Sequence, residues 1–191
     1  MLRWCPTGPF VFLPIHAAGI YKAETVENAF EYVVSSYMPT LSPADSDITP
    51  PTEPFKMLAV IQPTTPDLES LPYTVDELRR IESHAPKDSL VTLLNGSVND
   101  VISQLPATSI VHFACHGQTE RNPLESALFL EDGPLTVSQL MEQRQSMPKA
   151  SLAFLSACET AMGDKNLPDE VIHLGSAILF AGFREVIATM W

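Results

Sequence analysis

Short apolar runs recur along the chain from residue 57 onward and alternate with amphipathic or polar stretches. Bounded by turn residues, these runs have the length of buried strands in a parallel sheet. They cover Met57–Ile61, Leu90–Leu94, 109–114, Ala127–Leu130, 151–155 and 185–190. Alternation of strands and helices with short links predicts an α/β fold with a mostly parallel central sheet and helices on both faces.

Helix start signals lie between these runs. A Ser or Thr followed three residues later by an acidic residue or Gln is typical of a capping box, and Pro favours a first turn. Capping boxes predict one helix that begins at Thr74, with Glu77, and ends at His84, and another that begins at Thr136, with Gln139, and ends at Arg144. Ser97 is predicted to cap a helix that ends near Gln104, and Pro168 to open a helix that ends at Phe180. Gly182 is expected just beyond the last helix, where its conformational freedom ends a helix well.

The N-terminal part is less regular because Pro and Gly interrupt its apolar residues. We expect a strand or a strand-like core segment at 10–13 and a short helix at 25–32. Residues 39–54 contain five prolines among Ser, Thr and Asp, which indicates an internal loop. With this loop included, residues 1–191 are predicted to form a single domain.

Composition narrows the classes of function. At 191 residues and 45% hydrophobic, the chain can bury one sizeable core. A formal charge of −12 disfavours nucleic acid or an anionic membrane as a partner. Three scattered cysteines indicate a reducing, cytoplasmic setting, and no stretch is apolar for long enough to span a bilayer. No Gly-rich phosphate loop is present, and we expect no cofactor or metal.

Two short motifs follow predicted strands: His-Phe-Ala-Cys-His-Gly at 112–117 and Ser-Ala-Cys-Glu-Thr at 156–160. The carboxyl ends of parallel strands meet at one edge of a sheet, where α/β proteins place their chemistry. If the two strands are neighbours, His116 and Cys158 should lie within about 7 Å of each other. An imidazole beside a thiol is the minimum arrangement for a cysteine nucleophile.

In this interpretation His116 is the catalytic base and Cys158 the nucleophile. The backbone N–H groups of Gly117 and Cys158 would form the oxyanion hole. No third catalytic residue stands out, because His112 lies inside the predicted strand. Cys115 should point to the opposite side from His116 and belong to the core, and Cys5 is expected to be structural. The alternative that His116 and Cys158 are ordinary packed residues stays open.

The motifs, with residues 122–130, 154–163, 169–174 and 181–191, resemble the CHAT domain, and residues 13–19 resemble the start of fungal members. The resemblance implies a caspase-like three-layer α/β/α sandwich and a cysteine endopeptidase related to caspases and separases. By motif position, His116 is the implied base and Cys158 the implied nucleophile. A protein or peptide is the implied substrate, and a tetratricopeptide-repeat region is an implied companion in the full-length protein.

The chain departs from the family at its end. Family members continue past the Thr-Met-Trp segment, which here ends at Trp191, through an acidic residue of the substrate pocket. We therefore expect a C-terminally incomplete fold, a fragment of a larger signalling protein that is poorly soluble or self-associating in isolation and has little or no peptidase activity. The main alternative function is a catalytically silent CHAT-type interaction module. A small hydrolase is less favoured, because no Gly-x-Ser-x-Gly nucleophile motif is present.

Overall fold

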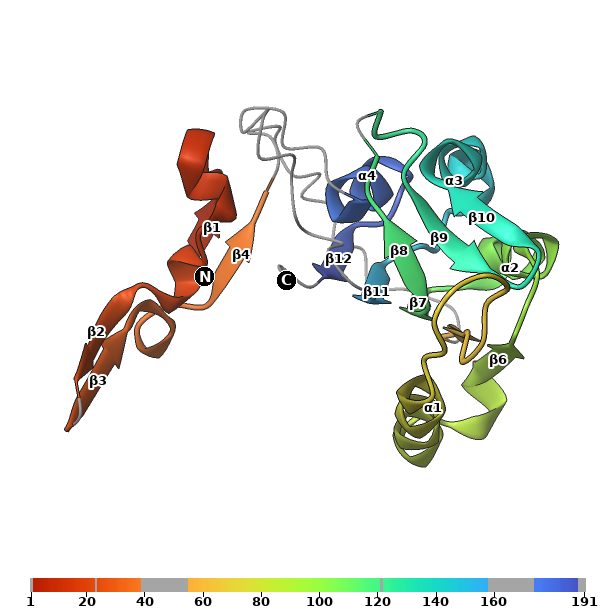
Figure 1. Cartoon of the computed structure of the whole chain (residues 1–191), viewed down its shortest axis with the longest axis horizontal. Helices are drawn as coiled ribbons and strands as arrows, with labels where there is room; N and C mark the ends of the chain where they lie inside the picture. Colours follow the sequence, from red (N-terminus) through yellow and green to blue (C-terminus); the bar gives the residue numbers. More distant parts are fainter. Residues whose placement is uncertain (1, 23, 39–54, 121, 158–173, 189–191) are drawn as a thin grey trace.

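A five-stranded sheet forms the centre of the computed structural model, which describes residues 2–22, 24–38, 55–120, 122–157 and 174–188 (Figure 1). Its strands are β5 (Met57–Ile61), β6 (Leu90–Leu94), β7 (Ile110–Ala114), β11 (Leu152–Ser156) and β12 (Glu185–Ala188). They run in the order β12-β11-β7-β5-β6, and every neighbouring pair is parallel. The predicted α/β fold with a parallel central sheet is confirmed.

Strand β7 occupies the middle of this sheet, between β5 and β11. Its last residue, Ala114, lies opposite Ile61 of β5 and Ser156 of β11. The two strands that precede the sequence motifs are therefore direct neighbours, as predicted. Because all three strands are parallel and in register, their carboxyl ends reach the same edge of the sheet.

In the part of the chain that the structure describes, four α-helices cover the sheet: α1 (Tyr73–His84), α2 (Val98–Gln104), α3 (Val137–Glu142) and α4 (Leu174–Phe180). The main core lies between one sheet face and helices α2, α3 and α4, whereas Leu78 of α1 packs with Ala59, Ile61 and Ala114 on the opposite face. Helices on both faces give the expected three-layer arrangement (Figure 1).

The helix cap predicted at Ser97 and the capping box predicted at Thr136 are both formed, and Asp100 completes a capping box at Ser97 as well. The box predicted at Thr74 is wrong. Helix α1 begins at Tyr73 after Pro72, and the Thr74 hydroxyl donates to the Leu71 carbonyl at 2.8 Å. Helix α3 ends at Glu142, earlier than predicted, and a 3-10 turn follows it. At the end of α4, Gly182 adopts a φ of +122°, as its predicted role after a helix requires.

A second, antiparallel sheet packs beside the main core. It consists of β8 (His116–Gln118), β9 (Ala127–Leu130) and β10 (Gly133–Thr136), with β9 in the middle. Gly133, at a φ of +139°, follows the turn between β9 and β10. Short 3-10 helices lie before β6 and after α2 and α3, at Lys87–Ser89, Leu105–Ala107 and Arg144–Ser146.

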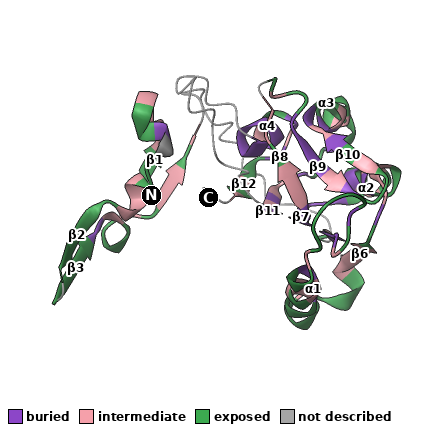
Figure 2. Ribbon diagram, in the orientation of Figure 1, coloured by how far each residue is buried: buried purple, intermediate pink, exposed green. Residues whose placement is uncertain are grey.

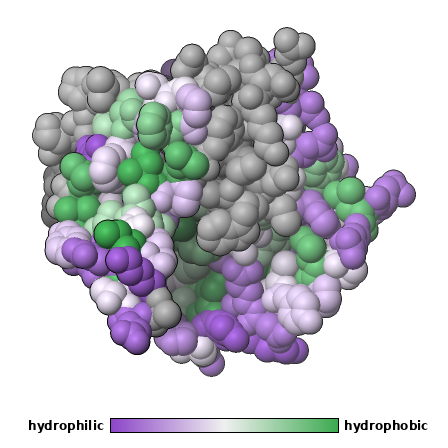
Figure 3. Space-filling view, turned by 60° about the vertical axis from the view of Figure 1, so that its left-hand side comes forward, coloured by the Kyte–Doolittle hydropathy of each residue, from purple (hydrophilic) through white to green (hydrophobic). Residues whose placement is uncertain are grey.

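The N-terminal segment, residues 2–38, forms two small sheets that are separate from the central one. Its elements are β1 (Leu2–Trp4), η1 (Gly8–Phe12), η2 (Ile15–Ala17), β2 (Gly19–Lys22), β3 (Thr25–Asn28), η3 (Ala29–Glu31) and β4 (Ser35–Tyr37). Most of this segment is exposed, in contrast to the buried central strands (Figure 2). It carries several exposed apolar side chains, and apolar patches are visible in the space-filling view (Figure 3).

Both predictions for the N-terminal segment are wrong. The expected strand at 10–13 is replaced by the 3-10 helix η1, because Pro9 near its start has the φ of a helical turn. The expected helix at 25–32 begins instead as β3, where β-branched Thr25 and Val26 pair with Lys22 and Tyr21 of β2. A single hairpin partner was enough to override a weak helical pattern.

Some predictions fall outside the described residues. These are the loop at 39–54, the start of the last predicted helix at Pro168, and the final two residues of the last predicted strand, 189–190. Among the helices that the structure describes, none has both the length and the apolar character to cross a membrane.

Candidate active site

The two motifs meet the central sheet at neighbouring strand ends. Strand β7 ends at Ala114, and two residues later His116 begins β8. Strand β11 ends at Ser156, the residue opposite Ala114. Cys158 lies outside the described residues, so its predicted distance to His116 and its part in an oxyanion hole stay predictions. Gly117 lies in β8 opposite Leu128 of β9.

The His116 ring is held by the main chain of a distant loop. Its Nε2 lies 2.7 Å from the Glu69 carbonyl oxygen. A carbonyl oxygen can only accept a hydrogen bond, so Nε2 carries the hydrogen and donates it. In the neutral imidazole the lone pair is then on Nδ1, the nitrogen that can act as a base. The contact therefore selects one tautomer and one ring orientation.

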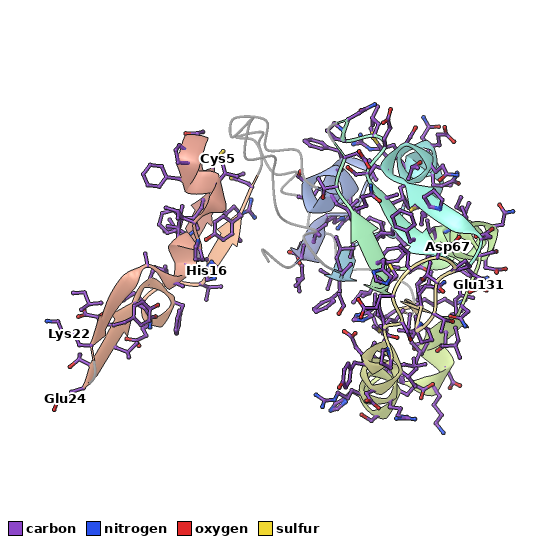
Figure 4. The ribbon with its side chains drawn as sticks, in the orientation of Figure 1. Cys5, His16, Lys22, Glu24, Asp67 and Glu131 are labelled. Atoms are coloured by element: carbon purple, nitrogen blue, oxygen red, sulfur yellow. The ribbon has the colours of Figure 1, made fainter. Side chains whose placement is uncertain are left out.

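The loop that presents Glu69 is braced by its own hydrogen bonds. Both the Ser70 hydroxyl and the Leu71 N–H donate to the Pro63 carbonyl, at 3.0 and 2.8 Å. At its start, the buried Gln62 side chain donates to the Gly96 carbonyl at 2.8 Å. Asp67, labelled in Figure 4, adopts the left-handed conformation with a φ of 61°. The carbonyl that holds His116 is thus fixed by a folded loop.

Sequence reasoning missed Glu69 as the third member of the site. The group that contacts His116 is a main-chain carbonyl, which every residue has, so residue type carries no signal for it. A clue lies in the spacing of turn residues between β5 and α1, which include Pro63, Pro66 and Pro72. That spacing indicates a compact loop but not which carbonyl points to His116.

Cys115 differs from a reactive thiol. Cys115 is 1% exposed, and burial raises the pKa of its thiol to about 12. It stays protonated near neutral pH and is a poor nucleophile. This confirms the prediction that Cys115 belongs to the core. Cys5 is partly buried and lies in the N-terminal segment (Figure 4).

A second polar group lies on the α1 face of the sheet, near the same strand ends. One Glu77 carboxylate oxygen lies 3.1 Å from Nε2 of His112, and the other accepts a hydrogen bond from the Ser156 hydroxyl at 3.1 Å. The His112 contact has ion-pair distance, although the ring N–H is not aligned on the oxygen. The His112 ring stacks on Phe154, with 4.9 Å between centroids and 16° between planes.

These contacts control the ionisation of Glu77. Partial burial alone would raise the pKa of its carboxyl group, but the close contact with His112 and the hydrogen bond from the Ser156 hydroxyl outweigh this effect. The net result is a Glu77 pKa below its ordinary value. Glu77 was predicted only as part of a capping box, and sequence reasoning did not foresee its link to two strands. Within the described residues, no group of three or more His, Cys, Asp or Glu could hold a metal ion.

Comparison with known proteins supports the resemblance seen in the motifs. A search of the curated proteins found no match. The family model described as "CHAT domain" matches residues 1–191. The match spans both motifs, the central sheet and the loop that carries Glu69. The chain therefore belongs to the CHAT domain family.

Proposed function

We propose that this chain is a caspase-like cysteine endopeptidase domain, with His116 as the general base and Cys158 as the nucleophile. The observation that carries the proposal is the His116 ring, held through Nε2 by the Glu69 carbonyl at the carboxyl end of β7. Strand β11, which leads to Cys158, is the direct neighbour of β7. Membership of the CHAT family, which is related to cysteine peptidases, supports the same chemistry.

The proposed reaction uses only groups of the chain and water. Nδ1 of His116 takes the Cys158 thiol proton, and the thiolate attacks the carbonyl carbon of a peptide bond. The N–H groups of Gly117 and Cys158 stabilise the oxyanion. His116 then gives its proton to the leaving amine as the C–N bond breaks, which leaves the acyl group on Cys158 as a thioester. Water, deprotonated by His116, hydrolyses the thioester, releases the new carboxyl group and restores the thiol.

The proposal extends to the setting of the domain. A protein or peptide is the substrate, and a tetratricopeptide-repeat region in the full-length protein is a candidate for delivering it. A cytoplasmic location agrees with a catalytic thiol, which must stay reduced. The net charge of −12 fits neither nucleic acid nor an anionic membrane as a partner.

Selective alkylation of the cysteines tests the proposal. The protein is treated with iodoacetamide near pH 7, and peptide mass mapping gives the rate of modification at each cysteine. Cys158 should react well before Cys5 and Cys115, and His116→Ala should slow its reaction. The His84→Ala variant is the matched control, because His84 also contacts a main-chain carbonyl, that of Arg80 at 2.8 Å, but lies at the exposed end of α1.

Turnover of a fluorogenic peptide library supplies the second measurement. Cys158→Ser and His116→Ala should each abolish cleavage, while His84→Ala should leave it unchanged. Equal labelling of all three cysteines, or a Cys158 rate that His116→Ala does not change, would identify Cys158 as an ordinary thiol. In that case the peptidase proposal is wrong.

A further inference from the structure

Glu77 makes contacts that join three elements of the fold at one carboxylate. It projects from α1 and contacts His112 on β7 with one oxygen and Ser156 on β11 with the other, each at 3.1 Å. His112 precedes His116 by four residues, and Ser156 precedes Cys158 by two. The carboxylate therefore bridges the two strands from which the proposed base and nucleophile extend.

The position of this bridge on the sheet makes it informative. His112 lies opposite Ala59 and Phe154. Ser156 lies opposite Ala114, which is two residues further along β7 than His112, towards the carboxyl ends of the strands. Parallel strands are already joined by main-chain hydrogen bonds, so a carboxylate is not needed to pair them. What it adds is a diagonal link between β7 and β11, with a side chain of α1 as the common point.

Stability alone does not explain a buried polar group at this place. The side chains of His112 and Glu77 are only 7% and 31% exposed. Moving such groups out of water costs free energy that their mutual contact only partly offsets, and apolar residues of similar size often stabilise a protein at least as well. The neighbouring contacts on the same face, among Ala59, Ile61, Leu78 and Ala114, are apolar. The polar group is confined to the strands that lead to His116 and Cys158.

The loop before the same helix contacts the proposed base directly. Glu69, in that loop, holds the His116 ring through its carbonyl, and Glu77 lies one residue before Leu78, the apolar anchor of α1. A single segment, residues 62–84, thus contacts His116 through its main chain and both strands, β7 and β11, through a side chain. Displacing α1 would alter all these contacts together.

We propose that Glu77 is a positioning residue, which aligns His116 with Cys158 by binding His112 of β7 and Ser156 of β11 at the same time. The inference rests on the proposed peptidase function and adds a residue that touches neither the substrate nor the reacting atoms. A loss of alignment of about 1 Å at a reacting group can lower a rate by roughly 100-fold. Such a loss should lower kcat and leave KM nearly unchanged, because substrate binding does not involve Glu77.

Isosteric replacement tests this role. Glu77→Gln keeps the shape of the side chain, but its amide nitrogen cannot accept a hydrogen bond from either partner. We expect kcat for peptide cleavage to fall by roughly 10- to 100-fold, and alkylation of Cys158 by iodoacetamide to slow in parallel. Glu82→Gln is the matched control, because Glu82 lies on the exposed part of the same helix. It should leave both rates unchanged.

A milder variant keeps the inference testable if Glu77→Gln does not fold. Ser156→Ala removes only one hydroxyl, which donates to Glu77. It should lower kcat in the same direction, and the double variant Glu77→Gln/Ser156→Ala should lose less than the product of the two single losses. Such non-additivity is expected of residues that act as one unit.

Cys115 separates misalignment from a general loosening of the fold. Its thiol is buried in the main core next to His116, so iodoacetamide should not modify it in any variant that stays folded. Slower Cys158 alkylation with Cys115 still protected supports the positioning role. If Cys115 becomes reactive in both Glu77→Gln and Ser156→Ala, the group has a structural role only, and the inference is overturned.

The remaining outcomes distinguish this inference from the proposal on which it rests. If the unmodified protein shows no His116-dependent reactivity of Cys158 and no cleavage, the peptidase proposal fails, and the alignment role fails with it. If the unmodified protein is reactive but Glu77→Gln behaves like Glu82→Gln, the peptidase proposal stands and Glu77 has no positioning role.

Discussion

The two faces of the central sheet differ in chemistry. One face packs against α2, α3 and α4 through large apolar side chains, among them Leu58, Val111 and Phe113, which are fully buried. The other face meets α1 through a small apolar cluster and the polar group formed by Glu77, His112 and Ser156. Burial of apolar area is the main source of stability, so the first face should carry most of it.

The contrast shows how one sheet can separate two tasks. Alternate residues of each strand point to opposite faces, so a strand can place a core residue and a polar residue side by side in sequence. In β7, Val111 and Phe113 enter the main core while His112, between them, contacts Glu77. The main core and the polar group therefore occupy different faces of the same strands.

Removal of a large side chain from the main core should have the largest effect. Phe113→Ala leaves a cavity on a face with no solvent access, and we expect the free energy of unfolding to fall by about 3–5 kcal/mol. Urea unfolding followed by circular dichroism measures the change. A loss below about 1 kcal/mol would contradict the assignment of stability to this face.

Truncation of an apolar side chain on the α1 face should lower the free energy of unfolding by less. Leu78 is 8% exposed and belongs to a small cluster, so Leu78→Ala is expected to lower the free energy of unfolding by about 2 kcal/mol, at the low end for such changes. The same urea titration applies. A loss as large as that of Phe113→Ala would show that the two faces contribute equally and would break the comparison.

Helix capping offers a smaller test of the main-core face. The Ser97 hydroxyl accepts from the Asp100 N–H at 3.1 Å, and Ser97→Ala should lower the free energy of unfolding by about 1 kcal/mol. Ser103→Ala, on the exposed side of the same helix, is the control and should change it by less than about 0.5 kcal/mol. Equal effects of the two substitutions would show that the capping box contributes nothing.

The acid dependence of stability should show the smallest effect. The pKa of Glu77 lies below its ordinary value of 4.5 in the folded protein, so its contribution is complete above about pH 4.5. The contribution is lost as the pH falls through the folded-state pKa. The difference in unfolding free energy between the unmodified protein and Glu77→Gln should therefore shrink on acidification. Glu82→Gln supplies the baseline, and a difference that grows towards low pH would contradict the prediction.

The local pattern of apolar residues predicted secondary structure correctly where the chain is buried. Continuous apolar runs located the strands of the central sheet to within one residue at β7 and β11, because both faces of a covered parallel strand exclude water. The helix cap at Ser97 and the capping box at Thr136 involve only residues close in sequence, and both were predicted correctly. The burial of Cys115 followed from the alternation of residues along a strand.

The errors lie where a partner outside the segment itself decides its conformation. Residues 25–28 formed a strand because β2, which comes just before them in the chain, pairs with them, and the box at Thr74 failed because Glu77 turns towards His112 and Ser156. His112 and Ser156 are distant from Glu77 in sequence, and no local signal identifies them. Residue type alone cannot indicate which of two competing hydrogen bonds a side chain will form.

The sequence by itself determined the alternation of strands and helices, the membership of both motifs in one family pattern, and the choice of His116 and Cys158 as candidates. Only the tertiary structure decided that β7 and β11 are neighbours, that the Glu69 carbonyl holds His116, and that Glu77 bridges the two strands. The physical reason is that hydrophobic periodicity is a local property. A carbonyl or carboxylate, in contrast, acquires its role from whichever distant groups folding brings within hydrogen-bond distance.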